Sequence, residues 1–269
     1  MPELDPKKSA RAFYARSLAR ERARAGLTQA ALGAHPAVMV SGKLVGHIEN
    51  CRRPPTLRIS RAFDRALNLE EHFEGLYALM VREEGEPPAI YEYYDLEDQA
   101  SSIKAYDSLW INGLLQTEET AREILRAGQG EDRLEELVAA RMERQAILRR
   151  ETPPWLMVAM DEFVLRRIVG SRDVTRRQLE HLLTVMEESD VSIVIVPRDA
   201  PIHPSGSFTL LELPDGLNVG YVEGAAGQGR LLGPGQPVRN LGLLLDRIAS
   251  TALPVTDSEK LIRSALEDL

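Results

Sequence analysis

The segment from Thr28 to Arg53 concentrates polar and basic side chains at spacings that suit binding to nucleic acid. Lys43 and His47 are four residues apart, so a helix would carry both on one face, where they can contact base edges or phosphates. Thr28 and Ser41 are each placed to cap a helix, and the backbone N–H groups at a helix N-terminus attract phosphate oxygens. The chemistry of this segment therefore indicates a nucleic-acid interface.

The remaining candidates in this segment have supporting roles. Gly42 and Gly46 carry no side chain, which would let the backbone approach DNA closely, and the helix is expected to turn them outward together with Lys43 and His47. Two arginines follow the helix and are expected to reach flanking phosphates, which dominate affinity while groove-facing side chains set sequence preference. The candidate DNA-binding residues are Thr28, Gln29, Ser41, Gly42, Lys43, Gly46, His47, Asn50, Arg52 and Arg53.

Short helices separated by turns must position these side chains. The apolar spacing predicts a helix that ends near residue 25, a second over residues 29–33 and a third over residues 41–50. The inward-facing residues of the third helix are expected to be Leu44, Val45 and Ile48. In a helix-turn-helix, one short helix braces another whose outer face enters the major groove, and the second and third predicted helices have the parts that this arrangement requires.

Two more helices complete the predicted N-terminal domain. They are expected over residues 57–67 and 70–82, so residues 8–82 should form an all-α domain of five helices. The next residues, 83–89, are predicted to be a linker, because they are charged, carry Gly and Pro and lack a hydrophobic pattern. Residues 90–269 should then form the second domain.

Charge is divided unevenly along the chain. Residues 1–65 contain 13 Lys and Arg against five Asp and Glu, a net charge of +8, whereas residues 66–269 contain 20 against 36, a net charge of −16. A basic module joined to an acidic body suggests that only the N-terminal part binds a polyanion. Charge by itself does not separate DNA from RNA or a membrane surface, and two solvated surfaces of different charge are the alternative.

The hydrophobic period changes within the second domain. Helical patterns come first, at residues 95–110, 117–127 and 131–150. Short apolar or β-branched runs then predict strands at residues 155–160, 191–196, 207–213 and 217–223, with a hairpin turn at Pro214-Asp215-Gly216. Further helices are expected at residues 162–169, 174–188, 236–252 and 257–267. The second domain should therefore be an α+β domain with a small sheet.

An ordered set of N-terminal motifs carries a resemblance to a known family. The residues are Arg22, the run from Gly26 to Gly33 (Gly-Leu-Thr-Gln-Ala-Ala-Leu-Gly), Val40-Ser41, and the run from Ile48 to Pro54 (Ile-Glu-Asn-Cys-Arg-Arg-Pro). This set resembles the lambda-repressor-like, Xre-type helix-turn-helix family of DNA-binding regulators. That family usually has Gly where Cys51 lies, in a left-handed conformation; Asn50 is expected to take that role, or the helix ends differently. The resemblance implies that Glu49 braces the domain rather than reads bases.

A second set of motifs runs through the rest of the chain. It comprises Gly113-Leu-Leu-Gln-Thr-Glu118, Arg141, Arg144-Gln145, Pro153-Pro154, Asp161-Glu162, Leu165-Arg166-Arg167, Gly170, Gln178-Leu179, His181-Leu182, Val194-Ile-Val-Pro197, Phe208-Thr-Leu-Leu211 and Tyr221-Val-Glu-Gly224. The set resembles the C-terminal domain of WhiJ-type, actinobacterial, antitoxin-like regulators, with Asn112 in place of a usual Pro. This resemblance implies a transcription regulator that is bound and modulated by a small companion protein encoded nearby.

Other polar and aromatic groups have plainer interpretations. Asp161, Glu162 and His181 could form a hydrolytic group, but an acid pair at a strand end followed by a distant His is more often a cap or surface charge, so no enzymatic activity is expected. The run from Gly224 to Arg230 lacks the ending of a phosphate-binding loop and is expected to be a surface loop. Five aromatic residues are expected to pack the linker against a domain, with a ligand pocket or an interface as alternatives: Tyr91, Tyr93, Tyr94, Tyr106 and Trp110.

Composition excludes several classes of protein. The single Cys51 excludes an internal disulfide, and the five histidines show no paired metal-ligand spacing, so no metal and no cofactor are expected. No apolar run approaches the about 20 residues that a membrane helix needs, and no secretory leader follows Met1. A cytoplasmic location with no membrane contact is therefore expected.

The sequence as a whole predicts a sequence-specific, DNA-binding transcription regulator. Its partners would be double-stranded operator DNA and the small companion protein, whose binding to the second domain would change operator occupancy. Two copies on a pseudo-palindromic site would multiply affinity, so a homodimer is expected. The alternatives are an antitoxin-like interaction protein and a regulator that senses a small ligand.

Overall fold

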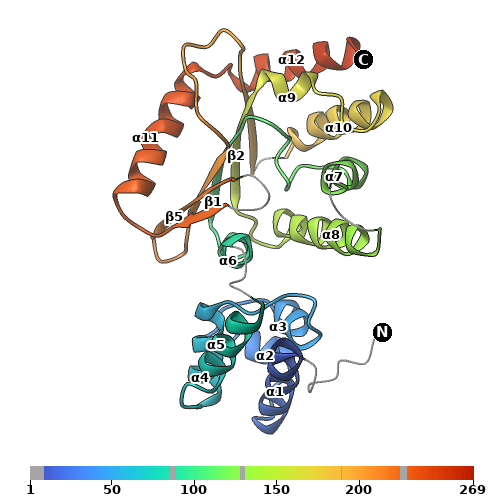
Figure 1. Cartoon of the computed structure of the whole chain (residues 1–269). Helices are drawn as coiled ribbons and strands as arrows, with labels where there is room; N and C mark the ends of the chain where they lie inside the picture. Colours follow the sequence, from blue (N-terminus) through green and yellow to red (C-terminus); the bar gives the residue numbers. More distant parts are fainter. Residues whose placement is uncertain (1–8, 85–88, 128–130, 189, 225–228) are drawn as a thin grey trace. The chain divides into compact units, whose positions relative to one another are not determined.

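The chain forms two compact units, residues 1–95 (unit 1) and residues 96–269 (unit 2). The computed structural model describes residues 9–84, 89–127, 131–188, 190–224 and 229–269 (Figure 1). The boundary between the units falls inside a helix that begins at Ala89, the last residue of the predicted linker. Each unit has its own set of elements and is described by itself.

Unit 1 is helical throughout its described residues. Its first five helices are α1 (Ala10–Arg24), α2 (Gln29–Gly33), α3 (Gly42–Glu49), α4 (Leu57–Leu67) and α5 (His72–Glu84). The first four begin after a Ser or Thr whose hydroxyl accepts a backbone N–H of the first turn: Ser9, Thr28, Ser41 and Thr56. Such a cap satisfies a donor that the helix leaves without a partner. The predicted number and order of these five helices are confirmed.

One apolar core joins the five helices. Tyr14 and Leu18 of α1 are fully buried together with Val45 of α3, Phe63 of α4 and Phe73 of α5. Fully burying a side chain of this size contributes about 1.5–3 kcal/mol, so the unit gains most of its stability from these contacts. The core is what fixes the orientation of α3, whose predicted inward residues are all buried.

The linker predicted over residues 83–89 is helical at both ends. Glu83 and Glu84 continue α5, and Ala89 begins α6 (Ala89–Glu97); residues 85–88 lie outside the described residues. The charged residues and the missing apolar pattern therefore did not predict where α5 ends, because the helix continues to Glu84.

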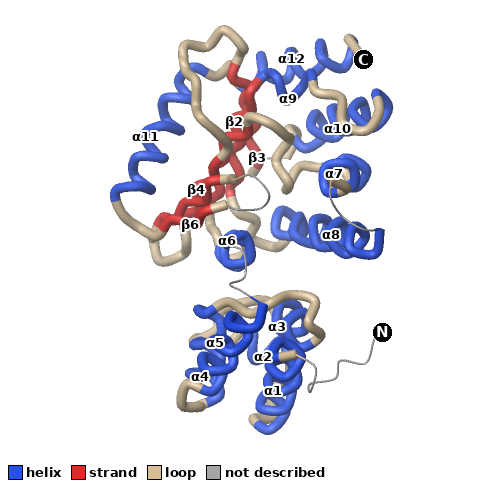
Figure 2. The backbone as a smooth tube through the Cα atoms, viewed as in Figure 1, coloured by secondary structure: helices blue, strands red, loops and turns tan. Residues whose placement is uncertain are grey.

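Unit 2 is built on a six-stranded mixed sheet (Figure 2). Its strands are β1 (Ser102–Asp107), β2 (Trp155–Asp161), β3 (Val191–Val196), β4 (Phe208–Glu212), β5 (Asn218–Val222) and β6 (Arg230–Leu232), in the spatial order β3-β2-β1-β4-β5-β6. The first three strands are parallel, and β4, β5 and β6 each run antiparallel to the neighbour before them. The predicted hairpin joins β4 and β5, with Gly216 at φ 78°.

Helices cover the sheet on both faces. They are α7 (Glu118–Leu125), α8 (Glu131–Arg144) with the 3-10 turn η1 (Gln145–Arg149), α9 (Glu162–Arg166), α10 (Arg172–Val185), α11 (Gln236–Thr251) and α12 (Val255–Glu267). Figure 1 shows α11 on one face and α7, α8 and α10 on the other. Leu245 and Ile248 of α11 are buried against Tyr106 of β1 and Ala159 of β2. Among the described helices, none is long and apolar enough to cross a membrane.

Two strands differ from the sequence prediction. Residues 95–110 were expected to be helical, but they contain the end of α6 and then β1, which pairs with β2 and β4. Both partners of β1 are far away in the sequence, so local periodicity carries no signal for the pairing. The short strand β6 lies where a surface loop was expected to end. The sheet is consequently larger than predicted, while the four predicted strands are confirmed.

Candidate nucleic-acid interface

Helices α2 and α3 cross closely because small residues line their contact. A Cβ atom on Gly42 would lie 2.5 Å from Ala30 Cα, and one on Gly46 would lie 2.9 Å from Gln29 Oε1. Both distances are below normal van der Waals contact. The crossing therefore requires glycine at position 42, where the contact is with backbone, whereas a side chain at position 46 would displace the Gln29 amide. The prediction that Gly42 and Gly46 face outward is wrong, since Gly42 faces the backbone of α2 and Gly46 is buried. Because Gly42 and Gly46 have no side chains, α2 can pack directly against this face of α3.

A buried carboxylate ties the three helices around this crossing. Glu49 on α3 accepts from Arg22 Nε at 2.6 Å and Nη2 at 2.9 Å, and from Gln29 Nε2 at 2.6 Å. Only 5% of the Glu49 side chain is exposed, and its hydrogen bond and charge raise the pKa of Arg22. Such charge-assisted, bidentate pairs are among the strongest polar contacts in proteins. The expected bracing role of Glu49 is confirmed, and the Gln29 amide takes part in it.

The outer face of this pair carries part of the predicted set. Thr28, Ser41 and Lys43 are exposed, and His47, one turn after Lys43, is half-buried. The hydroxyl of Ser41 accepts the Leu44 N–H at 3.2 Å, so it acts as the cap of α3. The structure thus brings a cationic side chain and the N-terminus of α3 to one surface, a combination that favours phosphate oxygens.

The end of α3 differs from both expectations. Asn50 keeps a negative φ of −101° and donates its amide to Gly46 O at 2.7 Å, while Cys51 takes the left-handed conformation at φ 54°. That conformation costs a residue with a side chain roughly 1–2 kcal/mol. Arg11 Nη2 donates to Cys51 O at 2.9 Å and helps to hold the turn. Sequence reasoning missed Arg11, because nothing local connects it to a turn 40 residues away.

The two arginines after α3 have different surroundings. Arg52 is exposed, whereas only 18% of the Arg53 side chain is. Arg53 pairs with the buried carboxylate of Asp95 at 2.6 Å and donates to the Tyr91 carbonyl. The expectation that Arg53 reaches DNA is therefore not supported, since its guanidinium is held by α6.

The five aromatic residues do not form one cluster. Tyr91 and Tyr94 lie against the Arg53 guanidinium. Its carbon, Cζ, is 5.6 Å from the centre of the Tyr91 ring and 5.8 Å from the centre of the Tyr94 ring. Tyr93 and Tyr106 are buried, and the Tyr106 hydroxyl donates to Asp161 at 3.4 Å. Trp110 lies on the surface of unit 2. Tyr91 and Tyr94 thus pack beside the predicted linker, as expected of these aromatic residues, while Trp110 lies on a different surface.

The possible hydrolytic group has structural contacts. Asp161 caps α9 by accepting the Phe163 N–H at 3.0 Å, and Glu162 pairs with Arg166 at 3.2 Å. Within the described residues, no hydrogen bond joins His181 to either carboxylate, and burial lowers the pKa of His181. The described part of the chain also contains no group of three or more His, Cys, Asp or Glu that could hold a metal ion.

The motifs of unit 2 converge on one loop, residues 107–117. Gln145 Nε2 donates to Gly113 O at 3.0 Å and Gln116 O at 2.7 Å, and Gln178 Nε2 donates to Leu115 O at 2.8 Å. Further bonds come from Asn112 to Asp107 (3.0 Å), Gln116 to Ile111 O (2.7 Å) and Arg141 to Gln116 (2.6 Å). These buried amides satisfy the carbonyls of an irregular loop, which fixes its conformation.

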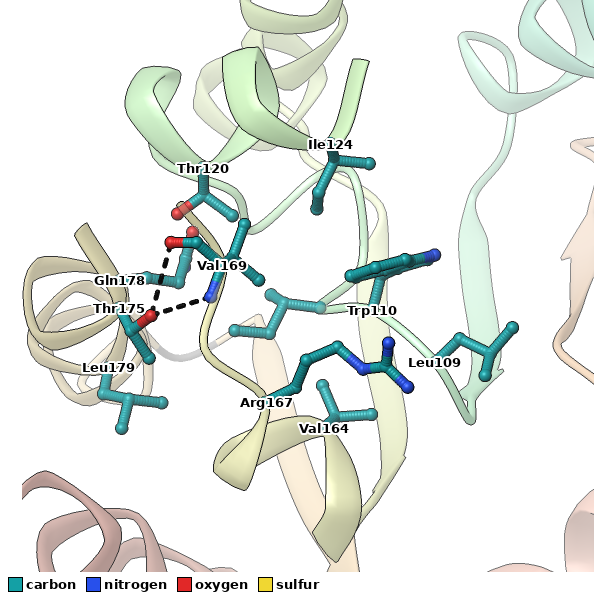
Figure 3. A pocket seen from close by; sticks show the side chains of 11 residues that line it. Leu109, Trp110, Thr120, Ile124, Val164, Arg167, Val169, Thr175, Gln178 and Leu179 are labelled. Carbon is teal, nitrogen blue, oxygen red and sulfur yellow. Dashed lines mark hydrogen bonds between the residues drawn. The ribbon is translucent and has the colours of Figure 1, made fainter. Parts of the chain in front are cut away.

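This loop forms one wall of a small pocket (Figure 3). The lining residues are Leu109, Trp110, Ile111, Thr120, Ile124, Val164, Arg167, Val169, Thr175, Gln178 and Leu179. Its free volume is about 10 Å³, roughly the space that one water molecule requires. The Arg167 guanidinium lies 4.7 Å from the centre of the Trp110 ring. The pocket is therefore a small surface depression beside the exposed side chain of Trp110.

The order of the two units and a comparison with known protein families show the family to which the chain belongs. A helical unit with a braced helix pair precedes a unit with a mixed sheet, and residues 90–264 match the family described as a domain of unknown function, DUF5753. The chain belongs to this family. No curated protein and no solved structure matched the chain.

Proposed function

We propose that this protein is a sequence-specific, DNA-binding transcription regulator whose C-terminal domain binds a small companion protein. In this proposal α2, the following loop and α3 act as a helix-turn-helix of the Xre type. The observation that carries it is the contact between Glu49, Arg22 and Gln29, which fixes α3 on its inner side while Ser41 and Lys43 remain on the outer side. A rigid helix with a polar, cationic outer face suits entry into a major groove.

Different residues would perform different parts of recognition. The exposed caps Thr28 and Ser41 begin helices whose N–H groups can bind phosphates, and Arg52, exposed after the C-terminal end of α3, would contact a flanking phosphate. Lys43 and His47 are the candidates for base edges. Two copies on a pseudo-palindromic operator would double these contacts, and the companion protein would change their availability from unit 2.

The test is binding of the full chain to its own upstream DNA and to a random duplex of equal length, over a salt series. Lys43→Ala should weaken binding to the upstream DNA about tenfold or more, with a smaller loss on random DNA. Arg65→Ala is the matched control, because it removes an equal, exposed charge from α4. Equal losses on both duplexes would remove Lys43 from the reading set, and no preference for the upstream DNA at any salt concentration would overturn the proposal.

The same assay with the companion protein tests the second part. Addition of the neighbour-encoded protein should change the affinity for upstream DNA. An antitoxin-like interaction protein is the second candidate, favoured by the exposed Trp110 and Leu109 of unit 2, and it predicts companion binding of equal strength with and without DNA. The pocket beside Trp110 gives little support to a small-ligand sensor, because its free volume of about 10 Å³ is too small for a metabolite.

A further inference from the structure

Unit 2 presents a compact apolar surface around Trp110. Leu109, Trp110 and Ile168 are all exposed, Leu109 by 51% and Ile168 by 46%. Leu109, Trp110 and Arg167 line the pocket, and Ile168 follows Arg167 in the chain. We call Leu109, Trp110, Arg167 and Ile168 the Trp110 surface. Figure 3 shows the Arg167 side chain extending alongside the Trp110 ring, with Val164 close to it. Tryptophan and arginine are the residues that most often dominate binding energy at protein interfaces.

The Trp110 surface is held rigidly from behind. Gln145 and Gln178 bind the carbonyls of Gly113, Leu115 and Gln116, in the loop that carries Leu109 and Trp110. Leu114, Leu115 and Ile111 of the same loop are buried, so its inner side belongs to the core. A preorganised surface loses little conformational entropy when a partner binds. Trp110 lines the pocket on one side and is 38% exposed on the other, so part of its ring remains available to a partner.

Charge on the Trp110 surface selects the partner's chemistry. Arg166 pairs with Glu162 and Asp268, whereas in the described part of the chain Arg167 makes no ion pair and its guanidinium lies against the Trp110 ring. A guanidinium stacked on an aromatic ring keeps donors that can bind a carboxylate. An isologous contact between two copies centred here would bring two Arg167 side chains together, which disfavours self-association through this surface.

We propose that the Trp110 surface binds a segment of the companion protein that presents a bulky apolar side chain next to an aspartate or glutamate. The apolar side chain packs on Trp110, Leu109 and Ile168, and the carboxylate pairs with Arg167. This inference rests on the proposed function, because it gives the location and the chemistry of the companion's contact.

The test uses the full chain and the purified neighbour-encoded protein in titration calorimetry. Trp110→Ala should weaken binding about 30-fold or more, and Arg167→Glu about tenfold or more. The matched controls come from the other tryptophan, Trp155, which is 41% exposed and lies 5.7 Å from Lys104. Trp155→Ala and Lys104→Glu remove the same chemistry elsewhere on unit 2 and should change affinity by less than about twofold.

Each outcome of this experiment decides the proposal. If wild type binds and both Trp110 surface variants keep its affinity, the Trp110 surface is wrong while the proposed function stands. If wild type binds no companion, the companion role itself fails and this inference fails with it. Arg167→Glu keeps the test valid if Trp110→Ala unfolds, because Arg167 is exposed. Restoration of its binding by an acid-to-lysine change in the companion would support the proposal directly. Loss of self-association in the same variants would instead assign the surface to a second copy and overturn it.

Discussion

The two candidate surfaces are held in place by different chemistry. Behind α3, a carboxylate with two charged hydrogen bonds joins helices of unit 1, whereas behind Trp110 neutral amides bind the carbonyls of a loop in unit 2. The outer sides differ as well, since Lys43 is cationic and Trp110 is aromatic. The comparison shows that in each unit the buried polar groups fix geometry, whereas the exposed groups differ in chemistry between the two surfaces.

The first test removes the charged brace. Glu49→Ala leaves Arg22, whose side chain is only 18% exposed, without its carboxylate, so the free energy of unfolding should fall by about 3–5 kcal/mol. Urea denaturation followed by circular dichroism measures the loss. Glu74→Ala is the control, because it breaks an exposed pair with Arg61 and should therefore cost far less stability. Equal losses in the two variants would show that the brace is not a buried ion pair.

The second test concerns the one carboxylate in the amide network of unit 2. Burial raises the pKa of Asp107 to about 7, and the neutral side-chain amide of Asn112 donates a hydrogen bond to its carboxyl group. The native state then keeps a proton that the unfolded chain loses near pH 4, so this group reduces stability as pH rises from about 4 to about 7. Below pH 4 the group makes no difference, and above pH 7 its cost is complete.

Asp107→Asn removes this pH dependence while an amide oxygen can still accept from Asn112. The difference in unfolding free energy between variant and wild type should move in favour of the variant by about 4 kcal/mol between pH 4 and pH 8. Urea denaturation at a series of pH values measures it. A difference that stays constant over this range would show that Asp107 is already ionised in the native state above about pH 4, as it is in the unfolded chain.

The third test weakens the amide network. Gln145→Leu leaves the Gly113 and Gln116 carbonyls without their donor and should cost about 2 kcal/mol of unfolding free energy. In a Trp155→Phe background the emission of Trp110 should change at the same time, because the loop that carries it loosens. Gln236→Leu, on the exposed start of α11, is the control and should have an effect within about 0.5 kcal/mol.

The smallest effect separates the two arginines after α3. If unit 1 binds DNA, Arg52→Ala should weaken binding by about 1 kcal/mol and reduce the salt slope by about 0.9, as loss of one phosphate contact does. Arg53→Ala should leave the salt slope unchanged and lower stability instead, because Arg53 is paired with Asp95. Identical salt slopes for the two variants would contradict this assignment.

Local signals accounted for a large part of the fold. The caps Thr28 and Ser41, the inward spacing of α3 and the hairpin around Gly216 were all predicted and are all present. Strand β1 was not predicted, because its partners β2 and β4 come much later in the chain. For the candidate site, the residue types indicated a nucleic-acid interface. They did not predict that Gly46 is buried or that Arg53 pairs with Asp95.

Helix caps, hydrophobic period, turn residues and the division of charge are properties of neighbouring residues, and the sequence alone was enough to identify them. Contacts between distant residues needed the folded chain: Arg11 with Cys51, Arg53 with Asp95, and Trp110 with Arg167. The physical reason is that a guanidinium has no partner until packing brings a carboxylate, a carbonyl or an aromatic ring to it. Packing therefore decided which arginines support the fold and which remain for binding.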